Sequence, residues 1–161
     1  MEVDIYRLGV IVANAGTTET GAITNGTGAY DAFLTGVTTI LGNKAPLAGS
    51  FAFISPSFYR HIRLDPLFIL PSDTGQQTRF NGQVATVEGL PVILVPNNYL
   101  ASGVEFAIHN RLATPAAQKL AEYKTHDNPP GINGWLVEGR IYHDAWAFDN
   151  KKNVIYVHRN S

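Results

Sequence analysis

Apolar residues in the first third of the chain recur at helical intervals. Val3, Tyr6, Val10 and Ala13 are spaced three or four apart, which places them on one face of a helix. The pattern fits the tail of a longer helix and an ordinary first amphipathic helix equally well. A second periodic segment follows, with Tyr30, Phe33, Leu34, Val37, Ile40 and Leu41 on one face. We therefore expect two helices before residue 43.

Capping residues set the expected limits of these helices. Asn25 or Thr27 is the predicted N-cap of the second helix, and Gly42 is its predicted C-terminal stop. In residues 55–64, Ser55 as N-cap and Pro56 in the first turn predict a third, short helix. Asp65-Pro66 should end it, because a residue before proline avoids the helical region.

Short apolar runs bounded by turn residues predict strands. Polar, glycine-bearing loops are expected at residues 17–28 and 72–83. The expected strands are residues 50–55, two strands on either side of Glu88-Gly89 within 84–96, residues 104–113, residues 135–148 and residues 153–157. The last two are expected to form a hairpin across Asp149–Asn153.

Residues 114–124, TPAAQKLAEYK, are ambiguous. Their composition favours a helix, whereas long-range sheet pairing can override that propensity. Helices in the first half and strands in the second predict an α+β architecture.

Composition narrows the possible functions. The 161 residues are 45% apolar, enough to bury a core, and contain no cysteine, which excludes disulfides and thiolate metal sites. The net charge is −1 and the basic residues are scattered, so the sequence gives no footprint for nucleic acid or an anionic membrane surface. We expect neither as a partner.

Two His-Asp pairs are the strongest candidates for chemistry. His126-Asp127 precedes a proline-rich loop and His143-Asp144 lies in an alternating strand. A metal-dependent hydrolase would need both pairs to converge on an ion, but adjacent residues of a strand point to opposite faces. We therefore expect Ile141, His143 and Ala145 on one face, and Tyr142, Asp144 and Trp146 on the other.

Other catalytic arrangements are weaker still. A triad of Ser55, His61 and Asp65 lacks a nucleophile elbow, and the glycine-rich loop near residue 16 lacks a phosphate-binding motif. The acidic residues of the strands sit in separate segments: Glu88, Glu105, Glu122 and Glu138. We predict no catalytic, cofactor-binding or metal-binding residues, and no cofactor.

Aromatic residues are plentiful and stand in apolar or glycine-flanked runs, including Phe51, Phe53 and Phe148. Core packing or contact between subunits explains them better than base stacking, which interleaves rings with Lys and Arg. A peptide- or glycan-binding module using Trp135 and Trp146 is a further alternative.

The order of several segments resembles the second half of tailed-phage major capsid proteins, the Hong Kong 97-type coat fold. The segments are a helix with Thr24, Asn25, Tyr30, Asp31, Ala32 and Phe33, then LGNKAP at Leu41–Pro46, FISPSFY at Phe53–Tyr59, the stretch Gly82–Pro96, and the closing stretch Gly134–His158. Each motif is weakly specific, but together they cover nearly the whole chain.

The resemblance implies a fold and a domain arrangement. Residues 1–16 would be the tail of a spine-like helix from the peripheral domain. Residues 17–161 would be an axial-type α+β domain whose closing strands return to the peripheral domain. The N-terminal arm and extended loop of such coats have no counterpart here, so a truncated coat fold is expected. The family also favours a strand at 114–124.

The implied function is structural, with no enzymatic activity. Such a subunit would assemble with itself into pentamers and hexamers of an icosahedral shell, with possible scaffolding or decoration partners. It would be found in the virion after assembly in the cytoplasm of a bacterial host. An encapsulin-like nanocompartment shell shares the fold and is the first alternative. A small metal-dependent hydrolase using the His-Asp pairs is the second.

Overall fold

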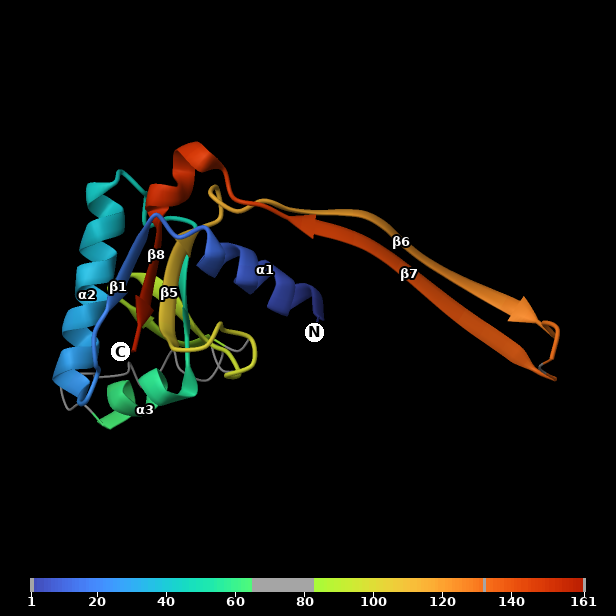
Figure 1. Ribbon diagram of the computed structural model, residues 1–161, viewed down its shortest axis with the longest axis horizontal. Helices are drawn as coiled ribbons and strands as arrows, with labels where there is room; N and C mark the ends of the chain where they lie inside the picture. Colours follow the sequence, from blue (N-terminus) through green and yellow to red (C-terminus); the bar gives the residue numbers. More distant parts are fainter. Residues whose placement is uncertain (1, 65–82, 132, 161) are drawn as a thin grey trace.

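The computed structural model describes residues 2–64, 83–131 and 133–160. A six-stranded mixed sheet in the order β1-β8-β5-β2-β4-β3 forms the body, and a two-stranded hairpin projects far from it (Figure 1). The elements are α1 Glu2–Ala13, β1 Thr17–Thr20, α2 Gly26–Gly42, β2 Ser50–Ile54, α3 Pro56–Leu64, β3 Gln83–Val87, β4 Leu90–Leu94, β5 Val104–Asn110, β6 Ala116–Asp127, β7 Trp135–Ala145, the 3-10 helix η1 Asp149–Val154 and β8 Ile155–Arg159. The α+β prediction is confirmed.

The sheet carries one apolar layer on each face, because side chains alternate along its strands. On β8, Tyr156 packs with α2 and α3, whereas Ile155 and Val157 pack with α1. The larger cluster, under α2 and α3, includes Phe33, Val37, Ile40, Ile54, Phe58, Phe106 and Ile108. The smaller cluster, under α1, includes Leu8, Ile11, Val12, Ala107 and Val157.

The predicted start and stop of α2 are both confirmed. Asn25 Oδ1 accepts a hydrogen bond of 2.7 Å from the backbone N–H of Gly28, so Asn25 is the N-cap. Gly42 is the last helical residue, but the left-handed position that ends the helix is Lys44, at φ 63°. The N–H of Lys44 donates to Leu41 O, so a terminal carbonyl of the helix is satisfied. Glycine is the usual residue at such a left-handed position.

The two-strand prediction around Glu88-Gly89 is also confirmed. Strands β3 and β4 pair antiparallel across it, and both turn residues have positive φ, 49° and 77°. That geometry matches the right-handed twist of a tight hairpin. The predicted break at Asp65-Pro66 and nearly all of the predicted loop 72–83 lie outside the described residues.

Two sequence predictions need correction. Residues 17–20 form strand β1, parallel to β8, instead of part of a loop. For residues 114–124, which the sequence left open between helix and strand, the structure shows strand β6 at residues 116–127, as the resemblance favoured; pairing with β7 overrides the local helix propensity. The expected terminal hairpin across Asp149–Asn153 is wrong: β7 pairs with β6, and β8 lies between β1 and β5.

Candidate subunit interface

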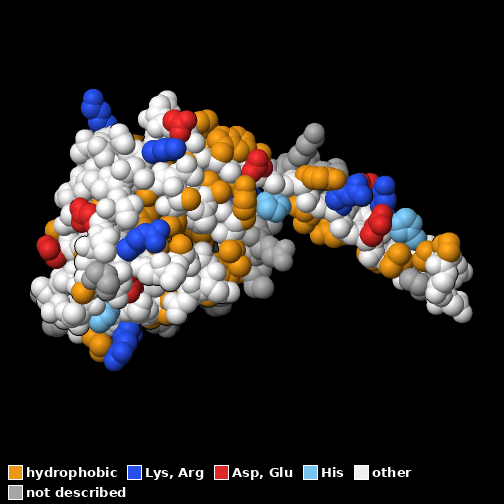
Figure 2. Space-filling view, viewed as in Figure 1, with side chains coloured by type: hydrophobic (Ala, Val, Ile, Leu, Met, Phe, Trp, Pro, Cys, Tyr) orange, Lys and Arg blue, Asp and Glu red, His pale blue; other side chains and the backbone are white. Residues whose placement is uncertain are grey.

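The projecting hairpin of β6 and β7 is the most unusual surface of the chain. The strands pair from Ala116–Ala145 at the root to Asp127–Trp135 at the tip. Figure 2 shows hydrophobic and charged side chains along its whole length, away from the body. An isolated two-stranded hairpin is at best marginally stable in water. The hairpin therefore lacks the second layer that a stable sheet requires.

One face of the hairpin is apolar and uncovered. Cross-strand partners share a face, so the register places Tyr123 and Gly139 together and Val137 on the same side. The apolar face is defined here by Tyr123, Trp135, Val137 and Ile141, with exposed fractions of 72%, 70%, 65% and 47%. The ring of Tyr123 lies directly over Gly139, where an added Cβ would meet it at 2.8 Å.

The opposite face carries the charges. The charged face is defined here by Glu122, Lys124, His126, Glu138 and Arg140. Lys124 Nζ lies 3.1 Å from Glu122 Oε1, and His126 Nε2 lies 3.2 Å from Glu138 Oε1. Leu136 and Tyr142 also lie on this face, and the Arg140 guanidinium stacks over the Tyr142 ring. Such exposed pairs contribute little to stability but keep this face hydrated.

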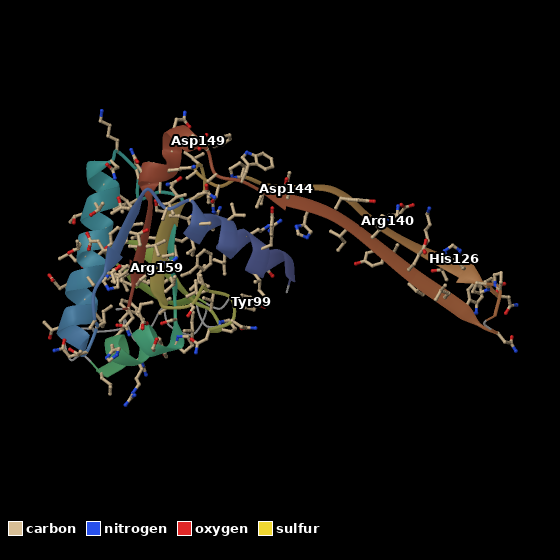
Figure 3. The ribbon with its side chains drawn as sticks, in the orientation of Figure 1. Tyr99, His126, Arg140, Asp144, Asp149 and Arg159 are labelled. Carbon is tan, nitrogen blue, oxygen red and sulfur yellow. The ribbon has the colours of Figure 1, made fainter. Side chains whose placement is uncertain are left out.

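Helix α1 is joined to the root of the hairpin through Tyr6. Its hydroxyl donates a 2.8 Å hydrogen bond to Asp144 Oδ1, and its ring meets the ring of His143 edge-on at 5.7 Å between centroids. The hydrogen bond from Tyr6 lowers the pKa of Asp144 below its ordinary value, and the same bond raises the pKa of Tyr6. Figure 3 shows Asp144 at the root, with Arg140 and His126 successively further out.

The structure keeps the two His-Asp pairs apart. His126 is paired in register with Leu136 near the tip, whereas His143 is paired with Gln118 near the root. His143 and Asp144 both contact Tyr6, at the point where β7 leaves the body. Across residues 2–64, 83–131 and 133–160, no group of three His, Asp or Glu side chains is placed to hold a metal.

Ser55 has a structural role that its sequence context only partly indicates. Its Oγ accepts from the N–H of Phe58 at 3.1 Å, which confirms the predicted cap of α3. The same hydroxyl donates to the buried carboxylate of Glu105 at 2.6 Å, and Ser57 donates to the same oxygen at 2.7 Å. Of the suggested triad, His61 lies on α3, and Asp65 is outside the described residues.

The two tryptophans do not form one binding site. Trp135 lies at the tip of the hairpin, and Trp146 follows its root, where its N–H bonds to Pro115 O. Both side chains are exposed, which fits surfaces used for contact better than core packing.

Sequence reasoning missed the pairing of β6 with β7, although the alternation of apolar and polar residues in 135–141 was the signal for a two-faced strand.

No family model and no curated relative matches this chain. A solved structure from Mycobacterium phage Che8 matches with a TM-score of 0.75 at 14% identity, covering 98% of this chain and 57% of that one. The mature capsid of bacteriophage PhiM1 matches at 0.69 and 10% identity, covering 98% and 60%. The chain has the fold of phage capsid proteins.

The capsid fold extends to a third neighbour of another origin. A virus-like particle from Pyrococcus furiosus matches with a TM-score of 0.57 at 10% identity, covering 97% of this chain and 61% of that one. The chain thus spans roughly three fifths of the length of these neighbours. The predicted tailed-phage coat fold, a mixed sheet flanked by short helices, is confirmed.

Proposed function

We propose that this chain is a structural subunit of a phage or prophage capsid that assembles with itself into pentamers and hexamers of an icosahedral shell. The observation that carries the proposal is the capsid fold together with a projecting hairpin whose apolar face is covered by no residue that the structure describes. Repeated contacts of modest strength suit a closed shell, because symmetry multiplies each one.

The proposal includes a domain division. Residues 1–16 form the tail of a spine-like helix, and residues 17–161 form an axial-type domain whose strands β6 and β7 return to the peripheral domain. Two observations support it: α1 contacts the hairpin through Tyr6, and the hairpin leaves the body beside α1 (Figure 1). In this arrangement the apolar face is covered in the shell rather than in solution.

The proposed subunit is not an enzyme, and its place is the virion after assembly in the host cytoplasm. Scaffolding and decoration proteins are proposed as further partners. Among the described residues, no helix is both long and apolar enough to span a bilayer.

An encapsulin-like nanocompartment shell is the second candidate, because a virus-like particle from Pyrococcus furiosus shares the fold. The genes beside the coding sequence separate the two candidates. Terminase, portal and protease genes there support a phage capsid, whereas their absence beside a gene for an enclosed enzyme favours the compartment.

Electron microscopy tests the proposed assembly. At millimolar concentration with polyethylene glycol, we expect five- or six-membered rings. Val137→Lys together with Ile141→Lys should abolish them, because both lysines would charge the apolar face. The matched control Glu138→Lys changes the charged face and should leave the rings intact. A chain that stays monomeric at every concentration, or rings that survive the double change, would contradict the proposal.

A further inference from the structure

A hollow lies between α1 and the adjacent face of the sheet. Its volume is about 560 Å³, within the range of protein binding pockets. Its apolar walls include Leu8, Ile11, Phe51, Phe53, Ile93 and Tyr99. Figure 3 shows Tyr99 next to α1, on the side of the body from which the hairpin leaves. The hollow is therefore a concave apolar surface beside the hairpin root.

Two buried nitrogens at the hollow have no hydrogen-bond partner among the described residues. The side chain of His109 lines the hollow and is 3% exposed. Its Nδ1 is engaged by Asn110 O and Thr114 Oγ1, each at 3.3 Å, but its Nε2 is unpaired. Arg7 also lines the hollow, and its Nε is unpaired. Buried polar groups are rarely left without a hydrogen bond, because the free energy lost on removing them from water is then not recovered.

The tip of the hairpin has the complementary chemistry. The side chains of Trp135 and Val137 are large, apolar and exposed. The register places Asp127 opposite Trp135, so a carboxylate shares the face of the exposed apolar side chains. A tip of this kind offers apolar side chains that can fill the hollow and a carboxylate that can accept from the unpaired Arg7 N–H.

The tip cannot reach the hollow of its own chain. Ala116 and Ala145, at the hairpin root, line the hollow themselves. The strands then run away from the body for their full length, and the tip lies far from it (Figure 1). Any hairpin tip seated in the hollow therefore belongs to another copy.

We infer that the hairpin tip of one copy docks in the hollow beneath α1 of the next copy, an inference that rests on the proposed shell function. Trp135 and Val137 fill the apolar walls, while Asp127 accepts from the unpaired Nε–H of Arg7. The charged face remains in water. The contact is head-to-tail, and such contacts close into rings when the rotation between copies allows it.

Cysteine cross-linking tests this contact, because the chain has no cysteine of its own. Val137→Cys in one preparation is mixed with Tyr99→Cys in another and treated with a short bismaleimide. Thr114→Cys, at the rim of the hollow, replaces Tyr99→Cys if that variant fails to fold. Two control mixtures are matched: Glu138→Cys with Tyr99→Cys, which uses the charged face, and Val137→Cys with Thr38→Cys, which uses an exposed site on α2.

We expect the tip-and-hollow mixture to give about fivefold or more cross-linked heterodimer than either control, because docking raises the effective concentration of the two thiols. Equal yields in all mixtures would overturn the inference. Rings in the microscope with control-level cross-linking leave the shell function standing and reject this contact. Specific cross-linking without rings supports the contact and rejects the shell function. If neither rings nor specific cross-linking is seen, the contact and the shell function are both rejected.

Discussion

The Tyr6 hydroxyl donates a 2.8 Å hydrogen bond to Asp144 Oδ1, a residue 138 positions away. This bond ties the first helix to the point where β7 leaves the body. The N–H of Ala145 donates to the same carboxylate oxygen at 2.8 Å, so Asp144 also holds its own backbone at this point. The direction of the hairpin therefore depends on a contact made by α1.

Removing the Tyr6 hydroxyl should change the titration of Asp144. Its folded-state pKa lies below the ordinary value of an aspartate, chiefly because Tyr6 donates to it. Tyr6→Phe should raise this pKa toward its ordinary value, as measured by NMR titration of the carboxyl carbon. The stabilisation is present above the unfolded pKa and is lost as the pH falls through the folded pKa. Tyr123→Phe, on the apolar face, is the control, and an unchanged Asp144 in Tyr6→Phe would contradict the bond.

Acid should weaken the fold through His109. Burial lowers the pKa of His109 from 6.5 to about 4, so the folded chain binds fewer protons than the unfolded chain between these values. The free energy of unfolding should fall by about 3 kcal/mol as the pH drops through this window and then level off. His109→Phe should remove this part of the acid sensitivity in urea titrations. His126→Gln, at an exposed site, should retain it.

The buried carboxylate of Glu105 makes Ser55 more important than an ordinary cap. Loss of a helix cap costs about 1 kcal/mol, and loss of a hydrogen bond to a charged group costs about 1.5–3 kcal/mol. Ser55→Ala should therefore destabilise the fold by about 3 kcal/mol. Ser57→Ala, which removes only one bond to the same oxygen, should cost about half as much.

Pro56→Ala is the matched change in the same turn and should cost less than about 1 kcal/mol, because it affects mainly the entropy of the unfolded chain. Denaturant unfolding measures all three variants. A loss in Ser55→Ala no greater than that in Pro56→Ala would mean that Glu105 contributes nothing through this contact.

Two glycines of α2 should respond oppositely to alanine. A Cβ at Gly36 would lie 2.8 Å from the Tyr156 ring and 2.9 Å from Ile108, whereas a Cβ at Gly42 meets nothing within 4 Å. Gly36→Ala should destabilise the fold by about 1–3 kcal/mol through overpacking. Gly42→Ala should be neutral or slightly stabilising, because alanine favours a helix. Thermal melting compares the two, and a melting point for Gly36→Ala at or above that of Gly42→Ala would refute the close approach.

In dilute solution we expect a monomer or a low oligomer. The contact inferred above involves one hairpin tip and one hollow, and small interfaces do not persist at low concentration. Native mass spectrometry at micromolar concentration checks this expectation. Closed shells from this chain alone under those conditions would show that its contacts are far stronger than the exposed surfaces indicate.

Local signals predicted the parts of the fold that depend on near neighbours. Asn25, Ser55 and the Glu88-Gly89 turn act within a few residues of their own position, and each was identified from the sequence. The pairing of β1 with β8 was missed, because a short polar strand at an edge has no apolar pattern of its own. A parallel partner so distant in sequence leaves no local signal.

The candidate interface was only partly predictable. Alternation in residues 135–141 indicated a strand with two faces, but the β6 partner was hidden by residues that favour helices. The Ser55–Glu105 contact joins residues 50 positions apart and follows from the placement of α3 against β5. Such contacts depend on tertiary packing, which periodicity in one segment does not encode.

The position of β8 has a consequence for how the chain is made. This strand, residues 155–159, lies inside the sheet, between β1 and β5. On a ribosome, β1 emerges long before β8, its neighbour in the described part of the chain, so it stays unpaired until residues 155–159 have been synthesised. Since such long-range pairing is slow, the sheet closes only after translation of this region. Until then β1 and β5 present open edges, and the newly made chain is at its most vulnerable to chaperone capture or aggregation.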